Sequence, residues 1–308
     1  RIDPHIELRR GRVEMRRTGV VGWTLAAPAL VVIAVFFAVP VIAGLALSLT
    51  DFDLYALADL STLRFVGLDN YLRLLHTDLF WQALGNTFYF VALGVPASIG
   101  LSLGAALLLN ARVAKFQALF RTALFAPVVT TVVAVAVIWR YLLHTRYGLI
   151  NQALAEFGID PVNWLGDPHW SMPAIILFAA WKNFGYNMII LLAALQAVPH
   201  ELYEAARVDG ARPLRQFTDL TFPMLTPTLV MVAIMTIAGY FQLFAEPYVM
   251  TQGGPLRSTV SVLYFMYEEG FRWWNLGYAS AVAFLLFLVI FTVSAGLLRF
   301  DRDPEASA

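Results

Sequence analysis

The most informative stretch of this chain reads Glu204-Ala-Ala-Arg-Val-Asp-Gly-Ala-Arg-Pro-Leu-Arg-Gln-Phe217. It is a charged segment between two long apolar runs, in a sequence that carries few charges elsewhere. Good helix formers precede Asp209-Gly210, and this pair stops a helix because glycine adopts the left-handed cap without steric cost. Pro213 then suits the first turn of a second helix. The segment is therefore predicted to be a helix–turn–helix on one surface of the protein.

The composition of the rest of the chain is that of a membrane protein. Hydrophobic residues make up 59% of the 308 residues and charged residues only 14%, whereas soluble domains carry roughly 25% charged residues. A helix needs about 20 residues to cross a hydrocarbon core, and open sheet edges cannot face lipid. The predicted fold class is therefore all-α, a polytopic membrane protein with six transmembrane helices at 20–49, 83–109, 119–139, 172–195, 224–250 and 278–298.

The predicted domain organisation has three parts. A short N-terminal segment covers 1–19, a six-span domain covers 20–300 and includes the charged loop 199–223, and a tail covers 301–308. The first apolar run is too long for the core of a signal peptide, so it is interpreted as a retained span.

The basic residues indicate the orientation in the membrane. Most of the 21 Lys and Arg residues lie in the N-terminal segment, in the connection around 112–121, in the charged loop and after residue 298. Cytoplasmic loops of membrane proteins carry an excess of Lys and Arg. Both termini and the charged loop are therefore expected in the cytoplasm, and a short amphipathic piece at 70–75 is expected on the outer side.

Several classes of function lack support in the sequence. A phosphate-binding loop requires Gly-Lys-Ser/Thr, and neither Lys115 nor Lys182 follows a glycine. The chain has no cysteine, its five histidines show no metal-ligand spacing, and its net charge of zero argues against nucleic acid as a partner. We therefore expect a protein that is not an enzyme on its own and that holds no metal.

The charged loop also carries a family signature. Glu204-Ala-Ala and Asp209-Gly210-Ala211, with Phe217 and Pro223, resemble the cytoplasmic coupling loop, or EAA loop, of ABC importer permeases of the carbohydrate branch. The likeness extends along most of the chain to Phe65-Val-Gly-Leu-Asp-Asn-Tyr71, Phe120-Arg-Thr122, Tyr147-Gly-Leu-Ile-Asn151 and Gly277-Tyr-Ala-Ser-Ala281. The turn Thr251-Gln-Gly-Gly-Pro255 is similar to that of the MalF-type member of the permease pair.

The resemblance implies one half of the translocation path of an ATP-driven, binding-protein-dependent importer for a sugar or oligosaccharide. Such an importer contains a second, MalG-type permease, two ATPase subunits that hold ATP and Mg, and an extracytoplasmic substrate-binding protein, all at the bacterial or archaeal cytoplasmic (inner) membrane. No cofactor is then expected in this chain. The residues implied in ATPase coupling are Glu204, Ala205, Ala206, Asp209, Gly210, Ala211, Phe217 and Pro223.

Two polar stretches inside the apolar runs are candidates for the substrate path. They cover 181–187 and 236–242, and both mix hydroxyl, amide and aromatic groups that suit a sugar. An alternative for each residue is hydrogen bonding between helices, which polar residues in membrane bundles commonly supply. The substrate-facing positions that the resemblance implies are Lys182, Asn183, Tyr186, Thr236, Gly239, Tyr240 and Leu243.

Lys182 is a basic residue deep within a predicted span. A charge at the bilayer centre costs on the order of 2.5–3.5 kcal/mol on insertion scales, so Lys182 is expected to face a cavity or a partner; a bond to backbone carbonyls is the alternative. Glu246 is the candidate counter-ion. A lysine side chain does not reach it, however, unless the helix that carries Glu246 is broken.

Other functions remain open at this stage. The transported compound can be a sugar phosphate or a polyol instead of a sugar. A stand-alone, ion-coupled secondary transporter would need a buried carboxylate in mid-membrane, and Glu246 lies near the predicted outer edge of its span. A membrane scaffold or receptor would explain the spans but not the two polar stretches.

Overall fold

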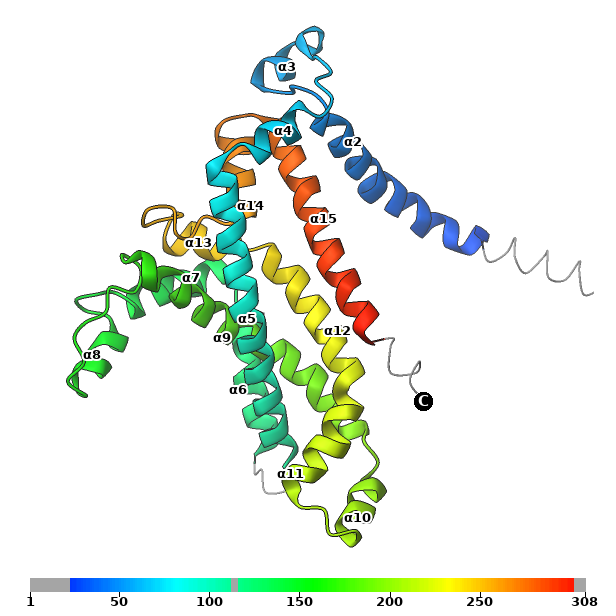
Figure 1. Cartoon of the computed structure of the whole chain (residues 1–308), viewed down its shortest axis with the longest axis vertical. Coiled ribbons are helices and arrows are strands. Elements are labelled where there is room, and N and C mark those ends of the chain that lie inside the picture. Colours follow the sequence, from blue (N-terminus) through cyan, green and yellow to red (C-terminus); the bar gives the residue numbers. More distant parts are fainter. Residues whose placement is uncertain (1–22, 112–115, 302–308) are drawn as a thin grey trace, which may run out of the picture.

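The computed structural model of this chain describes residues 23–111 and 116–301, which form a bundle of helices (Figure 1). Within these ranges, strand-like pairing is limited to an isolated bridge between Thr50 and Phe65. The prediction of an all-α membrane fold is confirmed. The predicted N-terminal segment 1–19 lies outside the described residues, as does the predicted tail except for its first residue.

Five of the described helices are long and apolar enough to cross a membrane. They cover Trp23–Ser48, Asp78–Asn110 (α5), Pro168–Ala197 (α9), Pro213–Phe241 and Leu276–Arg299. The first includes α2 (Val39–Ser48), the fourth includes α12 (Phe222–Phe241), and the last belongs to α15 (Leu276–Asp301). The other α-helices outside the bent third span are α3 (Leu54–Ala58), α4 (Asp69–Leu75), α8 (Leu149–Ala155), α10 (His200–Val208), α11 (Pro213–Gln216), α13 (Ala245–Met250) and α14 (Val262–Tyr267).

The third predicted span is sharply bent. It consists of α6 (Gln117–Val129) and α7 (Val132–Leu142), which meet at an angle of 99°. Thr130 and Thr131 between them have extended dihedral angles, and the Thr130 hydroxyl donates to the Pro127 carbonyl over 2.6 Å. This bond satisfies one of the carbonyls that the end of a helix leaves without an intrahelical partner.

The prediction of one continuous helix over 224–250 was wrong at its C-terminal end. α12 ends at Phe241, and α13 begins at Ala245 after a short irregular segment. Pro247 explains the break. In the interior of a longer helix its ring would clash with the carbonyl four residues earlier, whereas in the first turn of α13 its missing N–H removes no hydrogen bond.

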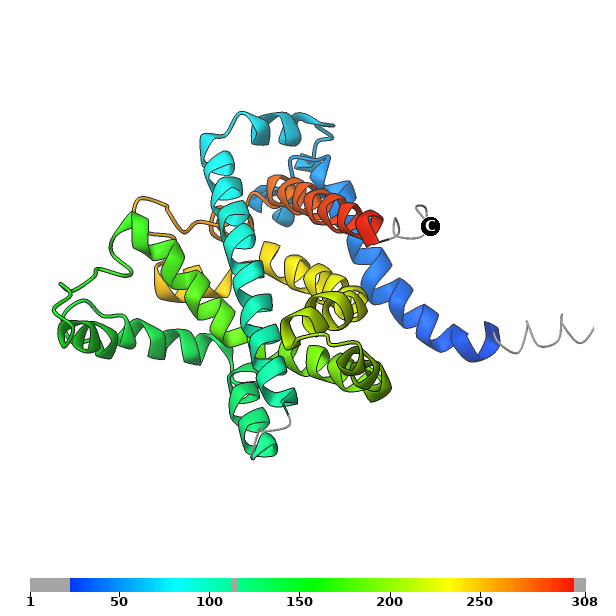
Figure 2. The same cartoon turned by 60° about the horizontal axis from the view of Figure 1, so that its bottom comes forward.

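The centre of the bundle is formed by α5 and α9, which pack against each other (Figure 2). The Ser102 hydroxyl on α5 donates to the Phe184 carbonyl on α9 over 2.9 Å. Such bonds help helices to associate in lipid, where apolar surfaces gain little from contact with each other. Phe90 on α5, Phe178 on α9 and Phe241 on α12 are fully buried and form part of the core.

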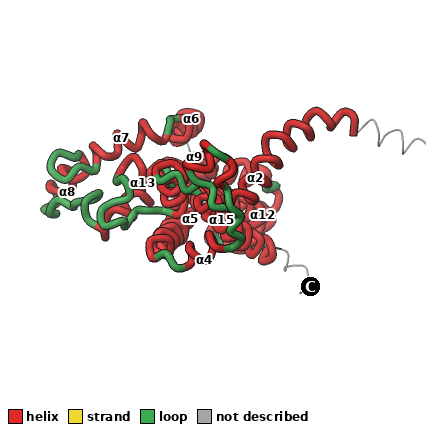
Figure 3. The backbone as a smooth tube through the Cα atoms, turned by 90° about the horizontal axis from the view of Figure 1, so that it is seen from above, coloured by secondary structure: helices red, strands yellow, loops and turns green. Residues whose placement is uncertain are grey.

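Two parts of the molecule project from this bundle (Figure 3). On one side, α7 and α8 extend outward. On the other side stands the first span, whose residues from Trp23 onward are almost all exposed and which contacts α15 through α2. The apolar surface of the first span is therefore available to lipid or to another subunit.

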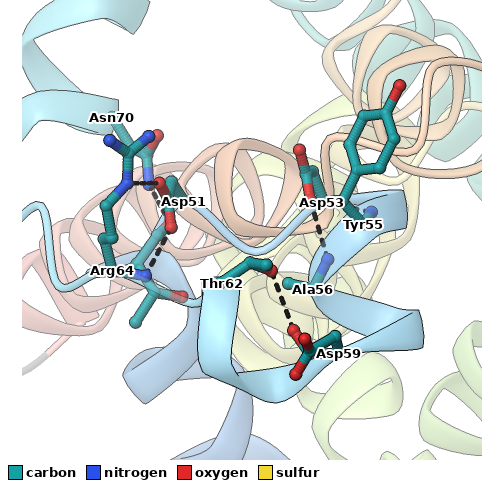
Figure 4. Close-up of polar contacts among 9 residues, drawn as sticks. Asp51, Asp53, Tyr55, Ala56, Asp59, Thr62, Arg64 and Asn70 are labelled. Atoms are coloured by element: carbon teal, nitrogen blue, oxygen red, sulfur yellow. Dashed lines mark hydrogen bonds and ion pairs between the residues drawn. The ribbon is translucent and has the colours of Figure 1, made fainter.

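The connection between α2 and α4 is held by a network of hydrogen bonds (Figure 4). The Asp51 carboxylate accepts from the main-chain N–H and from Nε of Arg64, at 2.7 and 2.8 Å. The Asn70 amide donates to the carbonyls of Ser48 and Thr50, at 2.9 and 2.8 Å. The main-chain N–H of Arg64, followed by its guanidinium, holds the pKa of Asp51 below its usual value. These bonds fix the start of α4, which covers the predicted short piece at 70–75.

Candidate functional site

A cavity of about 360 Å³ lies between α9, the end of α6 and the break that separates α12 from α13. α5 contributes one aromatic wall through Phe90. The lining mixes apolar side chains with hydroxyl, amide and carboxylate groups, and it consists of Phe90, Val128, Asn183, Tyr186, Asn187, Met235, Thr236, Gly239, Tyr240, Gln242, Leu243 and Glu246.

The structure brings together all but one of the predicted substrate-facing residues. Their spacing explains why. On a helix, residues three and four positions apart share a face, and this spacing holds both within α9 and within α12. The predicted residues that line the cavity are Asn183, Tyr186, Thr236, Gly239, Tyr240 and Leu243.

One predicted polar residue also joins two helices. The Asn187 amide on α9 donates to the Thr236 hydroxyl on α12 over 3.0 Å, and that hydroxyl donates to the Val232 carbonyl over 2.7 Å. Thr236 therefore serves the interhelical bonding considered as an alternative, while it also lines the cavity.

The Tyr240 hydroxyl, unlike that of Thr236, makes no hydrogen bond between the described helices. The Tyr240 side chain is only 6% exposed, and within the described part of the chain its hydroxyl has no hydrogen-bond partner. Its ring lies 5.0 Å from the ring of Phe90 and directly against Gly94. A buried hydroxyl without a partner is costly. The Tyr240 oxygen is itself shielded from solvent, as is the hydroxyl of Ser98 on α5, so it lies within the helix packing and is not open to the cavity.

Lys182 does not line the cavity. Its Nζ donates to the Val128 carbonyl over 3.2 Å, at the last turn of α6. The side chain is therefore held behind the cavity wall by a backbone carbonyl, which is the alternative that the sequence had left open. A cation at this position also suits the partial negative charge of a helix C-terminus.

Glu246 lines the cavity from the first turn of α13. Its charge and that of Lys182 act on each other, although these two described side chains form no ion pair within 4.0 Å. Sequence reasoning had placed Glu246 near the outer edge of a continuous helix. The break after α12 instead turns its carboxylate toward the cavity, and Pro247 was the available signal.

The predicted helix–turn–helix lies at the end of the bundle far from α3 and α4 (Figure 1). α10 ends at Val208, Gly210 adopts the predicted left-handed conformation with φ of 77°, and Pro213 begins α11. The Ala211 N–H donates to the Ala206 carbonyl over 2.9 Å, which closes the end of α10. The prediction of two short helices around a glycine cap is confirmed.

The second of these helices continues into the membrane bundle. A π-helical segment, Phe217–Thr221, joins α11 to α12 without a break. The Tyr203 and Thr221 hydroxyls lie 2.9 Å apart and tie α10 to this segment. Pro223 follows in the first turn of α12. Most of α10, including Glu204 and Ala205, is exposed, while Asp209 and Ala211 border a small hollow between the two helices.

Residues 97–303 match the family described as binding-protein-dependent transport system inner membrane component. The chain belongs to this family. The permease is 37% identical to the lactose transport system permease protein LacF of Rhizobium radiobacter over 289 residues, which cover 92% of this chain and 94% of LacF. It is 34% identical to the trehalose/maltose transport system permease protein MalF of Thermococcus litoralis over 295 residues, which cover 93% and 96%.

A solved structure has the same fold as this permease. It is a chain of a bacterial ABC transporter involved in the import of the acidic polysaccharide alginate, with a TM-score of 0.78 and 22% sequence identity. The match covers 96% of this chain and 99% of that chain.

Some lining residues of the permease cavity were missed from the sequence. Asn187 and Gln242 fall within the two polar stretches, and their helical spacing was a usable signal. Val128 and Phe90 carried no such signal, because each is an apolar residue in an apolar span. Their place in the wall depends on how α5, α6 and α9 pack.

Proposed function

We propose that this permease forms half of the translocation path of an ATP-driven importer and that it carries a sugar or oligosaccharide. The observation that supports this most directly is the chemistry of the cavity. Residues with amide and hydroxyl groups, among them Asn183, Tyr186 and Thr236, line a space that also has aromatic walls. Small-molecule sites typically combine apolar walls with a few polar groups that set orientation.

The relatives support the same class of substrate. Permeases similar to this chain carry names that refer to lactose, to trehalose/maltose and to arabinooligosaccharides. Their common chemistry is a ring with several hydroxyls, which needs hydrogen-bond partners and a flat surface for its apolar face.

We further infer that the energy comes from other subunits. The importer would contain a MalG-type second permease, two ATPase subunits that bind ATP and Mg, and an extracytoplasmic binding protein. α10 is the proposed contact with an ATPase subunit, because it is short, exposed and hydrogen-bonded through Tyr203 to the segment that leads into α12. A rigid helix transmits a displacement, and coupling requires contacts that differ between two states. The unequal distribution of Lys and Arg supports a cytoplasmic position for α10 and for both termini.

The test is transport by the complete importer. The permease is purified with the second permease, the ATPases and the binding protein encoded beside it, and the complex is placed in proteoliposomes. We expect ATP-dependent uptake of at least one of lactose, maltose, trehalose or an arabinooligosaccharide. Uptake of a polyol or a sugar phosphate alone, or uptake that follows an ion gradient without ATP, would contradict the proposal.

A further inference from the structure

Glu246 is the charged member of the cavity lining. The other polar lining groups are neutral amides and hydroxyls, and none of the described basic side chains lines the cavity. Its carboxylate is thus the acidic group that a ligand in this space would meet. It was not among the predicted site residues, because the fifth span was expected to be continuous and Pro247 was not read as a break.

The positive charge that balances Glu246 stands behind the wall. Lys182 is 7% exposed, and its ammonium group is already committed to the Val128 carbonyl at 3.2 Å. The two opposite charges interact without direct contact. Burial of a charge without compensation is strongly unfavourable, so Lys182 supports Glu246 at the cavity without occupying the cavity itself.

The hydrogen-bonding capacity around Glu246 fits a ligand with several hydroxyls. An ionised carboxylate only accepts hydrogen bonds, whereas a hydroxyl both donates and accepts. Neutral amide groups, such as that of Asn183, also line the cavity. A polyhydroxylated ring can donate to Glu246 and also pair with such an amide.

We propose that Glu246 determines the specificity of this cavity by accepting hydrogen bonds from neutral sugar hydroxyls and by disfavouring saccharides that carry a carboxylate or a phosphate. This inference rests on the proposed sugar transport. Like charges in a partly dehydrated space repel strongly, and a group that opposes the wrong ligand adds to selectivity as much as one that favours the right ligand. Lys182 supplies the opposite charge that offsets the burial of Glu246.

The experiment compares lactose with lactobionate, an anionic analogue of similar size. Binding of each radiolabelled compound is measured by equilibrium dialysis on the purified permease–ATPase complex without the binding protein, so that the selectivity of that protein does not contribute. The unaltered complex is expected to prefer lactose. In Glu246→Gln this preference should fall about tenfold, which corresponds to about 1.4 kcal/mol.

Two further variants control for other effects. Glu246→Asp keeps the negative charge and should keep the preference for lactose, even if lactose binds more weakly. Glu156→Gln makes the same chemical change at an exposed residue after α8 and should alter nothing. Size-exclusion profiles verify that each variant complex is assembled. If Glu246→Gln does not assemble, the test uses the ratio of lactose binding to lactobionate binding in Glu246→Asp and in the unaltered complex.

The outcomes separate the two proposals. An unaltered complex that binds lactobionate as tightly as lactose, or an unchanged ratio in Glu246→Gln, overturns the role of Glu246 and leaves sugar transport standing. Failure of the complete importer to take up any of the neutral sugars overturns the proposed function and this inference with it.

Discussion

Gly94 illustrates how much one residue decides in this cavity. A Cβ at this position would lie 2.9 Å from an edge carbon of the Tyr240 ring. Only glycine lets the ring lie this close to α5 and pack at a tilt against Phe90. Tyr240 is thereby held in the cavity wall, although Gly94 itself contributes no polar atom.

The Lys182–Glu246 interaction gives a prediction at the residue scale. Lys182→Met should lower the melting temperature of the purified complex, because it leaves the Glu246 charge without compensation. The double variant Lys182→Met/Glu246→Gln should recover part of that loss. A double-mutant cycle measured by thermal unfolding should give a coupling free energy on the order of 0.5–3 kcal/mol.

The matched control for this cycle is the exposed pair Arg272–Glu268, whose charged atoms lie 3.0 Å apart. Exposed ion pairs contribute about 0–1 kcal/mol, so Arg272→Met with Glu268→Gln should show little coupling. Additive effects in the Lys182–Glu246 cycle would mean that the two charges do not support each other.

At the scale of elements, short helices and the breaks between helices position the residues proposed to act in transport. α10 is predicted to transmit movement, and its end depends on the left-handed conformation of Gly210. A Cβ at Gly210 would meet nothing within 4 Å. Substitution at Gly210 therefore strains the backbone but causes no steric clash. The strain costs about 1–2 kcal/mol of stability.

Gly210→Ala should raise the number of ATP molecules hydrolysed per sugar transported, because the α10–α11 connection is distorted while the ATPase subunits stay intact. The measurement is the ratio of phosphate release to sugar uptake in proteoliposomes. Gly158→Ala is the control, since Gly158 also has a positive φ, of 72°, and open space around it, but lies after α8. An unchanged ratio in Gly210→Ala, or an equal rise in Gly158→Ala, would contradict the coupling role.

The elements also show how far sequence reasoning extends. The Asp209-Gly210 stop and the start of α11 at Pro213 were predictable, because each rests on local backbone preferences. The bend between α6 and α7 was not predicted, although Pro127 was visible. Proline is tolerated in membrane helices when neighbours satisfy the freed carbonyl, so only the packing around it decides between a kink and a break.

At the scale of the whole molecule, this chain is a membrane permease whose sequence lacks the Gly-Lys-Ser/Thr pattern of a nucleotide-binding loop. The chain purified alone should therefore release no phosphate from ATP above the background of a detergent blank. Hydrolysis should appear when the ATPase subunits are added, and phosphate release in detergent measures both. Steady hydrolysis by the purified single chain would overturn the division of labour between subunits.

The sequence by itself determined the membrane class, the number of apolar runs and the helix–turn–helix at 199–223, and the family resemblance indicated half of the residues that line the cavity. The first three follow from composition, helical spacing and local backbone preferences, which are properties of short stretches. Only the tertiary structure decided that Lys182 bonds to a backbone carbonyl and that Glu246 faces the cavity. Both depend on contacts between distant segments, such as Gly185, where a Cβ would lie 2.4 Å from the Leu124 carbonyl oxygen of α6. A close approach of this kind fixes how α9 packs against α6, and no local pattern records it.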